Sequence, residues 1–381
     1  MLIFFFAEAY LPVALRQMTD LNHAPFLKMS WRAQTSLILL LPIALVEAHA
    51  NGGSGWSKYL SSSSSALTLL GGLFGVGFSW ASSFSLLTMS LSRTSLAHST
   101  LCAVGMPPVF LTLWAVVVQR KRPVLLEVVG VVLAVVGIAI AVQDVGERGS
   151  ASGFAVAPTV AGDLIALGSA AMAASFGLCI SHVRAFAPSV PIFNFQCAWS
   201  ACAVPIALLL PILMGETDIL NDGPSAGTPS PGLFDWLLRG AYWPQMLFLA
   251  IGMGIVCQAA IAYVVQEAGP LPYGLVMCAC PAGSSVMGSL LGQAGIPGLS
   301  TVVGGGIVLV GLATVLVGND AREREAALLT EGSVFNGLAA SPSGGVASAI
   351  LRSQEPPHEQ HVVVGTDEEA HRTTDYRKYS R

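Results

Sequence analysis

Residues 268–319, AGPLPYGLVMCACPAGSSVMGSLLGQAGIPGLSTVVGGGIVLVGLATVLVGN, contain no Asp, Glu, Lys or Arg. As one helix this stretch would be about 78 Å long at 1.5 Å per residue, whereas the hydrocarbon core of a bilayer is about 30 Å thick. The chain must therefore fold back within it, and Gln293-Ala-Gly-Ile-Pro-Gly298 has the residue types of a turn. The stretch predicts two consecutive membrane-spanning helices.

The composition of the whole chain agrees with this prediction. Only 10% of the 381 residues are charged and 53% are apolar, whereas a soluble domain carries about 25% charged residues. This composition excludes a soluble enzyme, and the net charge of −4 excludes a generic nucleic-acid binder. Apolar runs between charges predict ten spans: 1–16, 27–47, 66–90, 95–118, 124–143, 161–183, 192–214, 245–266, 271–292 and 298–318.

The spans are expected to be α-helices, because every backbone N–H and C=O in lipid needs a partner within the protein. The first span is short, and we interpret it as a shortened helix from a truncated gene model. The last 63 residues hold 17 of the 40 charged residues and are rich in Glu, Ser, Gly, Pro and His, so we expect a disordered tail from Asn319 onward.

Three residues of the first half recur in the second half at one offset. Pro107, Gly130 and Gly137 are spaced by 23 and 7 residues, and so are Pro281, Gly304 and Gly311, 174 positions later. A similar offset relates the sequences Pro25-Phe-Leu-Lys and Pro191-Ile-Phe-Asn, which open the second and seventh spans. Coincidence in a Gly-rich chain is the alternative; duplication of five spans is the interpretation that we prefer. Since five is odd, the two copies would be inverted repeats.

The positive-inside rule predicts the orientation. Arg120-Lys121-Arg122 between the fourth and fifth spans is expected in the cytosol, which with ten spans places both termini there. Three basic residues count against this orientation if they lie in the loop between the first two spans, on the opposite side of the membrane: Arg16, Lys28 and Arg32. Plasma membrane and endomembrane are not distinguished.

A series of short motifs occurs in a fixed order along the chain: Trp31-Arg32, Arg93-Thr-Ser-Leu-Ala97, Pro107-Pro-Val-Phe, Gln119-Arg-Lys-Arg-Pro123, Gly130, Gly137, Pro281, Gly304 and Gly311. In these residues the sequence resembles the drug/metabolite transporter superfamily, in particular the EamA-like group of ten-helix carriers. The resemblance implies an all-α polytopic membrane protein of two inverted five-helix repeats around a central cavity. The implied organisation is a first EamA-like repeat at 1–143, a connecting loop at 144–160, a second repeat at 161–318 and a cytosolic tail at 319–381.

Polar and aromatic residues inside the spans are the candidates for solute contact or proton relay. They are Glu8, Trp80, His98, Gln196, Trp199, Gln258, Tyr263 and Tyr273. Glu8 is the candidate for proton coupling, with a carboxylate that reaches the interface as the alternative. His98 is a candidate pH sensor, or else an interfacial residue. For the amides and aromatic residues, hydrogen bonding between helices and anchoring at the interface are the competing interpretations.

The predicted function is secondary transport of a small organic metabolite by alternating access. The alternatives are a nucleotide-sugar or sugar-phosphate antiporter of the same superfamily, and a non-transporting scaffold or receptor. Spans 8 to 10 contain no basic residue to bind phosphate, which favours a neutral, zwitterionic or amphipathic solute. No catalytic residue, metal site or cofactor is predicted. The expected partners are the solute, the lipid bilayer and coupled protons, and homodimer formation is left open.

Overall fold

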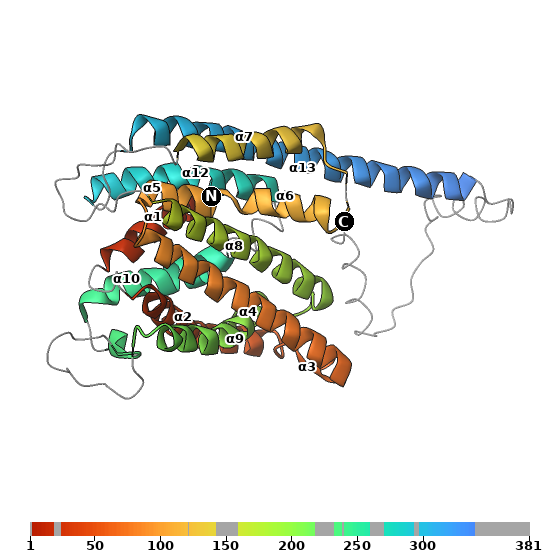
Figure 1. The fold of residues 1–381 in the computed structure, drawn as a ribbon. Coiled ribbons are helices and arrows are strands. Elements are labelled where there is room, and N and C mark those ends of the chain that lie inside the picture. Colours follow the sequence, from red (N-terminus) through yellow and green to blue (C-terminus); the bar gives the residue numbers. More distant parts are fainter. Residues whose placement is uncertain are drawn as a thin grey trace, which may run out of the picture. The chain divides into compact units, whose positions relative to one another are not determined.

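A computed structural model describes residues 2–18, 24–120, 122–141, 159–217, 232–237, 240–259, 270–292 and 297–339. This part of the chain consists of helices and connecting segments, without a β-strand (Figure 1). The helices are α1 Leu2–Gln17, α2 Pro25–Ala50, α3 Ser57–Leu60, α4 Ser63–Leu91, α5 Leu96–Gly105, α6 Pro107–Val117, α7 Leu125–Ala141, α8 Val160–Phe186, α9 Ile192–Leu213, η2 Asp235–Leu237, η3 Gly240–Tyr242, α10 Trp243–Leu247, η4 Phe248–Cys257, α12 Pro270–Leu290 and α13 Leu299–Ala339.

Within the described residues, each of the ten predicted spans overlaps helical structure. Among the described residues, 7 helical segments are long and apolar enough to cross a membrane, with α5 and α6 together forming one of them. The shorter α7 is also apolar. The predicted class, an all-α polytopic membrane protein, is confirmed.

Three elements differ from the predicted spans. The span 95–118 is interrupted at Met106, because Pro107 and Pro108 have no N–H to continue the hydrogen bonding of α5. The span 245–266 is a π-helix over η4, and residues 260–269 lie outside the description.

The third difference is at the end of the second half. Helix α13 continues to Ala339, so the expected disorder from Asn319 is wrong for residues 319–339. Residues 321–329 are mostly strong helix formers, and Arg324 pairs with Asp320 one turn away at 2.9 Å. The chain divides into two compact units, Met1–Arg324 and Glu325–Arg381. Residues 340–381 and most of the predicted connecting loop lie outside the described residues.

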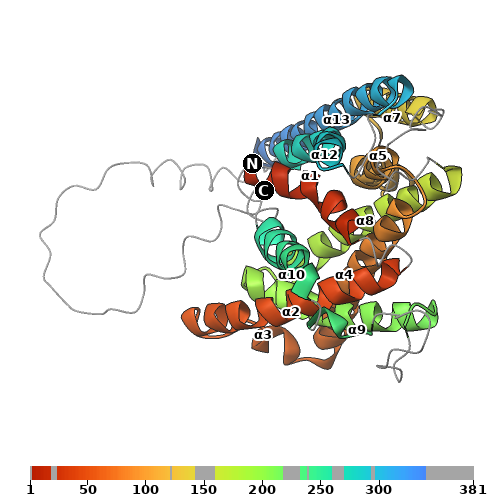
Figure 2. The same cartoon turned by 90° about the vertical axis from the view of Figure 1, so that its left-hand side faces the viewer.

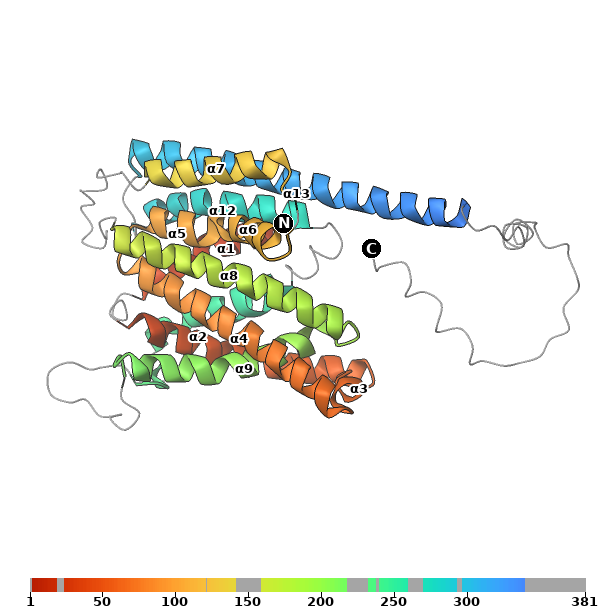
Figure 3. The same cartoon turned by 45° about the vertical axis from the view of Figure 1, so that its right-hand side comes forward.

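The helix pairs of the first unit recur when the two halves are exchanged. In the order of the chain, the helices of the first half are α1, α2, α4, α5 and α7, and their counterparts in the second half are α8, α9, η4, α12 and α13. When each helix is replaced by its counterpart, the contacting pair α4/α8 becomes the contacting pair η4/α1. In the same way, the pair α1/α12 becomes the pair α8/α5. The pairs α2/α9 and α5/α12 exchange into themselves. In all three views α7 and α13 lie at one side of the bundle and α2 and α9 at the opposite side (Figures 1, 2 and 3). This exchange symmetry is what a duplicated unit produces.

Helices α2 and α9 are antiparallel and cap each other. Glu47, near the end of α2, accepts a hydrogen bond at 2.8 Å from the backbone N–H of Asn194, the third residue of α9. Glu216, just after α9, accepts one at 2.8 Å from the N–H of Leu27, the third residue of α2. The first N–H groups of a helix have no partner within it, and a carboxylate is favourable there. The two halves thus make the same contact reciprocally.

Helices α7 and α13 meet at the glycines of the sequence repeat. A Cβ on Gly130 would lie 2.5 Å from the carbonyl O of Gly311, and a Cβ on Gly137 would lie 2.6 Å from that of Gly304. Since 130 corresponds to 304 and 137 to 311, exchanging the halves turns one contact into the other. The repeated glycines are therefore the contact surface between two antiparallel, equivalent helices.

A pair of glycines in α13 tests this contact. Gly304→Ala places a methyl group 2.6 Å from the backbone N of Ala141, whereas nothing lies within 4 Å of a Cβ at Gly306. We expect Gly304→Ala to destabilise the protein by about 1–3 kcal/mol, as overpacked contacts do. Gly306→Ala is expected to be neutral or stabilising by up to about 1 kcal/mol, from helix propensity. Thermal unfolding of the purified proteins in detergent measures both, and equal midpoints would contradict the contact.

Glu216 predicts a pH dependence of stability. Burial raises its pKa to about 7 from 4.5, against the opposing effects of the hydrogen bonds from Leu27 and Phe26 and the positive charge of Lys28. The folded state therefore binds the proton more tightly than the unfolded state, so this group's stabilisation declines as pH rises through 7. We expect the midpoint of thermal unfolding to fall between about pH 5 and pH 8 by less in Glu216→Gln than in the wild type. Parallel curves for the two proteins would show that Glu216 does not titrate in this range.

Candidate solute-binding site

Arg32 lies eight residues into α2 and is buried in the bundle, with 1% of its surface exposed. Its guanidinium carbon is 3.7 Å from the centroid of the Phe84 ring and 5.2 Å from that of Trp80, both on α4. None of its three nitrogens has a hydrogen-bond partner among the described residues. A buried charge without such partners is costly. The interpretation of Arg32 as a charge between the first two spans is therefore wrong.

Glu8 on α1 is the charged neighbour of Arg32. Its side chain is buried, and the two charges interact electrostatically. Cys257, at the end of η4, is close enough to interact with both. One residue from each of α1, α2 and η4 thus lies at this point of the bundle. Glu8 is buried among the helices, and its role in proton coupling stays a prediction.

An aromatic group continues the site toward the second half. The rings of Trp80 and Trp199 are edge to face with centroids 5.1 Å apart, and Phe176 of α8 lies against Trp199 at 5.5 Å. The indole N–H of Trp80 is buried and has no acceptor among the described residues. Two of the predicted site residues, one from each half, are therefore in contact.

Uncharged polar groups complete this region. Gln196 of α9 donates a hydrogen bond to the carbonyl of Gly254 in the π-helix η4. Ser36 lies one helical turn beyond Arg32, and its hydroxyl oxygen is so close to Gly254 that a Cβ on this glycine would touch it. This hydroxyl group has no hydrogen-bond partner among the described residues. We call this set the central cluster: Glu8, Arg32, Ser36, Trp80, Phe84, Gln196 and Trp199.

The remaining predicted residues are placed differently. Gln258 follows η4 and is partly buried. Tyr263 lies outside the described residues, and of Tyr273 only the backbone, within α12, is described. The role of every predicted residue in solute binding stays a prediction.

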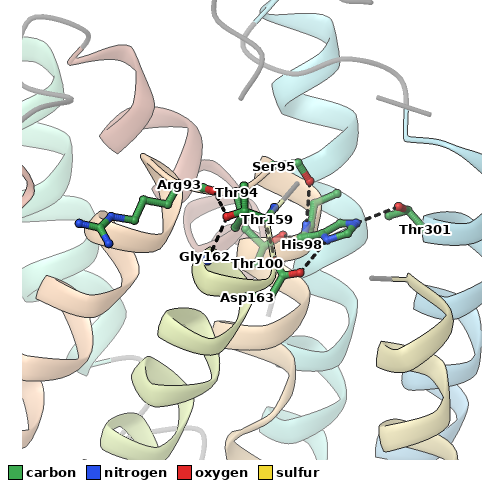
Figure 4. A network of polar contacts seen from close by, with 10 residues as sticks. Arg93, Thr94, Ser95, His98, Thr100, Thr159, Gly162, Asp163 and Thr301 are labelled. Atoms are coloured by element: carbon green, nitrogen blue, oxygen red, sulfur yellow. Dashed lines mark hydrogen bonds and ion pairs between the residues drawn. The ribbon is translucent and has the colours of Figure 1, made fainter. Parts of the chain in front are cut away.

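His98 belongs to a separate polar network where α5, α8 and α13 begin (Figure 4). Its Nδ1 is 3.2 Å from a carboxylate oxygen of Asp163, and its Nε2 is 3.2 Å from the hydroxyl of Thr301. Asp163 also accepts a hydrogen bond at 2.7 Å from the hydroxyl of Thr94. His98 is therefore not a lone interfacial residue, as one interpretation of the sequence held.

The network has the order hydroxyl, imidazole, carboxylate that is known from hydrolase triads. Its geometry also has a structural explanation, because it joins the first turns of three helices. Ser95 caps α5 and Thr159 caps α8, each through its side-chain oxygen, and the side chain of Arg93 points away from the group (Figure 4). The side chains of His98, Asp163 and Thr301 are all buried. We interpret the network as a joint between helix ends.

The other buried basic residues of the first half bind backbone carbonyls. Arg16 donates to the carbonyls of Leu91 and Thr94 at 3.4 and 3.1 Å, and Lys28 donates to that of Leu15 at 2.7 Å. Both residues are 4% exposed, so like Arg32 they lie within the bundle rather than in a loop.

The sequence-based reasoning missed Arg32, Phe84 and Asp163 as site or network residues. Arg32 and Asp163 lie close to the ends of the predicted spans 27–47 and 161–183, where a charged side chain is expected at the interface and not in a binding site. One signal for the burial of Arg32 is present in the sequence. Pro25 is a favourable first residue of a helix, so the helix continues on both sides of Arg32.

Comparisons with known proteins agree with this fold. Residues 1–143 match the model of the EamA-like transporter family. No curated protein matches the chain significantly. A solved structure described as "Crystal structure of protein" is similar at a TM-score of 0.50 and 17% identity, covering 84% of this chain and 97% of the other, which bears on the fold alone.

The resemblance predicted from the sequence is thereby confirmed, and residues 144–381 lie outside the family match. The chain is a multi-pass integral membrane protein, and its residues 1–143 are similar to the EamA-like transporter family of the drug/metabolite transporter superfamily.

Proposed function

We propose that the chain is a secondary carrier that moves a small organic solute by alternating access, with the central cluster as the solute site. The observation that carries this proposal is the reciprocal capping of α2 and α9 at opposite ends of the pair. Inverted repeats around a midplane site are the architecture in which one half rocks against the other. Opening one cap while the other stays closed would expose the site to one side at a time.

The site lies between the two equivalent halves. Arg32 and Trp80 belong to the first half, and Trp199 and Gln196 belong to the second. Rocking of the halves would change the distance between these groups, which a carrier requires of its binding site. The driving force is a proton gradient, with Glu8 as the coupling group, or the gradient of the solute itself.

The proposed orientation places both termini in the cytosol. Arg120 and Arg122 remain exposed. Arg16, Lys28 and Arg32, which counted against this orientation, are buried within the bundle. The positive-inside rule concerns residues in loops, so these three no longer oppose the assignment.

Labelling of two equivalent helix ends tests the inverted arrangement. Asn51 ends α2 and Met214 ends α9, and both are exposed. We expect single cysteines at these positions, in a chain without other cysteines, to react with a membrane-impermeant maleimide from opposite sides of the membrane. Labelling of both from the same side would exclude inverted halves.

Counterflow in liposomes tests transport itself. The reconstituted full chain is loaded with unlabelled solutes and assayed with radiolabelled amino acids, nucleosides, sugars, sugar phosphates and organic acids. We expect exchange of at least one class above protein-free liposomes, and we expect Trp80→Ala to reduce it by about 10-fold or more, as loss of a buried aromatic contact does. Exchange of sugar phosphates alone would favour the antiporter alternative, and no exchange would favour a scaffold or receptor.

A further inference from the structure

We propose that Arg32 binds a carboxylate group of the transported solute, so that the carrier is selective for small organic monoanions. This inference rests on the proposed carrier function and adds the substrate class to it.

The first argument is the state of the guanidinium group. It is buried, and its Nε and both Nη atoms have no hydrogen-bond partner among the described residues. Arg16 and Lys28, which are also buried, both donate to backbone carbonyls. Arg32 thus differs from the other buried basic residues of α1 and α2 in having its full set of donors available. A bound oxyanion would satisfy them.

The second argument is the availability of the N–H donors. The guanidinium carbon lies over the Phe84 ring, 3.7 Å from its centroid, and this cation–π contact uses none of the N–H donors. The five N–H bonds of a guanidinium lie in its plane, in a fork that matches the two oxygens of a carboxylate. A guanidinium that packs on a ring and keeps its donors unused is arranged for bidentate recognition.

The third argument concerns the charge of the anion. Glu8 is the acidic neighbour of Arg32 and adds no positive charge to the site. A dianionic phosphate would need further cations, and the other buried basic residues of α1 and α2, Arg16 and Lys28, donate to backbone carbonyls. A single guanidinium with unused donors therefore suits a monoanion. The absence of basic residues in spans 8 to 10 still argues against phosphate, but it does not exclude a carboxylate, because the cation comes from α2.

The fourth argument is the aromatic group next to Arg32. Trp80 lies 5.2 Å from the guanidinium carbon and contacts Trp199. Its unpaired indole N–H is one more donor beside apolar ring faces. Such a wall accommodates an apolar body attached to the carboxylate. Phenylacetate is a suitable probe, with phenylacetamide as its uncharged counterpart and phenyl phosphate as the dianionic one.

The experiment measures binding of radiolabelled phenylacetate to the purified full chain by scintillation proximity, with the other two compounds as competitors. We expect unlabelled phenylacetate to compete at least 10-fold better than phenylacetamide and better than phenyl phosphate, because the uncharged amide loses the charge-assisted hydrogen bonds to the guanidinium. Arg32→Gln should lose measurable phenylacetate binding. Arg93→Gln, the same substitution at an exposed arginine, should bind as the wild type does.

A conservative variant covers the case that Arg32→Gln fails to fold. Arg32→Lys keeps the charge and loses the planar fork, so we expect phenylacetate affinity to fall about 10-fold while the protein elutes as the wild type does from size exclusion. Unchanged affinity in Arg32→Lys, or retained binding in folded Arg32→Gln, overturns the inference. Preferential binding of phenyl phosphate overturns the choice of a monoanion.

The binding and counterflow experiments separate the two proposals. Counterflow of neutral solutes, together with absence of phenylacetate binding, leaves the carrier standing and refutes the carboxylate site. Arg32-dependent phenylacetate binding without counterflow of any solute supports the site and refutes the carrier. Absence of both binding and counterflow refutes both.

Discussion

The N–H groups that open a helix need acceptors, and inside a membrane protein water cannot supply all of them. In this chain the acceptors for α2 and α9 are Glu216 and Glu47, each supplied by the end of the opposite helix. The two helices are thereby fixed as an antiparallel pair with equivalent ends. The glycine contacts between α7 and α13 repeat this symmetry at the other side of the bundle. The pairs α4/α8 and α1/η4, and the pairs α1/α12 and α5/α8, are related by the same exchange of halves.

The central cluster contains several buried polar groups that lack a hydrogen-bond partner among the described residues. Arg32, Trp80 and Ser36 each bury a donor that has no partner among the described residues. Unsatisfied buried polar atoms are uncommon in folded proteins, and each one calls for an explanation. The polar network of His98 shows the contrast, because Asp163 and Thr301 occupy both nitrogens of its ring. A solute that completes the central cluster would explain why this region, and not the network, is left unsatisfied.

Some of the buried charged residues can be recognised in the sequence and others cannot. Glu8 is recognised as a candidate because it interrupts an apolar run close to the start of the chain. Arg32 and Asp163 do not stand out, because each lies near the end of a predicted span, where a charge can reach the interface. The burial of a residue depends on which helices pack around it, and only the structure shows that α4 packs against α2 at Arg32. The continuation of α13 beyond Gly318 was also missed, because helix formers with paired charges extend a helix that composition alone would end.

The sequence by itself determined the helical class, the approximate positions of the spans and the spacing of the repeated glycines. These follow from lengths of apolar runs and from residue offsets, which are properties of the linear chain. Which residues come together was decided by the tertiary structure. Trp80 and Trp199 are separated by more than 100 positions, and Arg32 meets Phe84 only because α2 packs on α4. A site formed between two halves depends on how those halves pack, and packing is set by many weak contacts that no local pattern encodes.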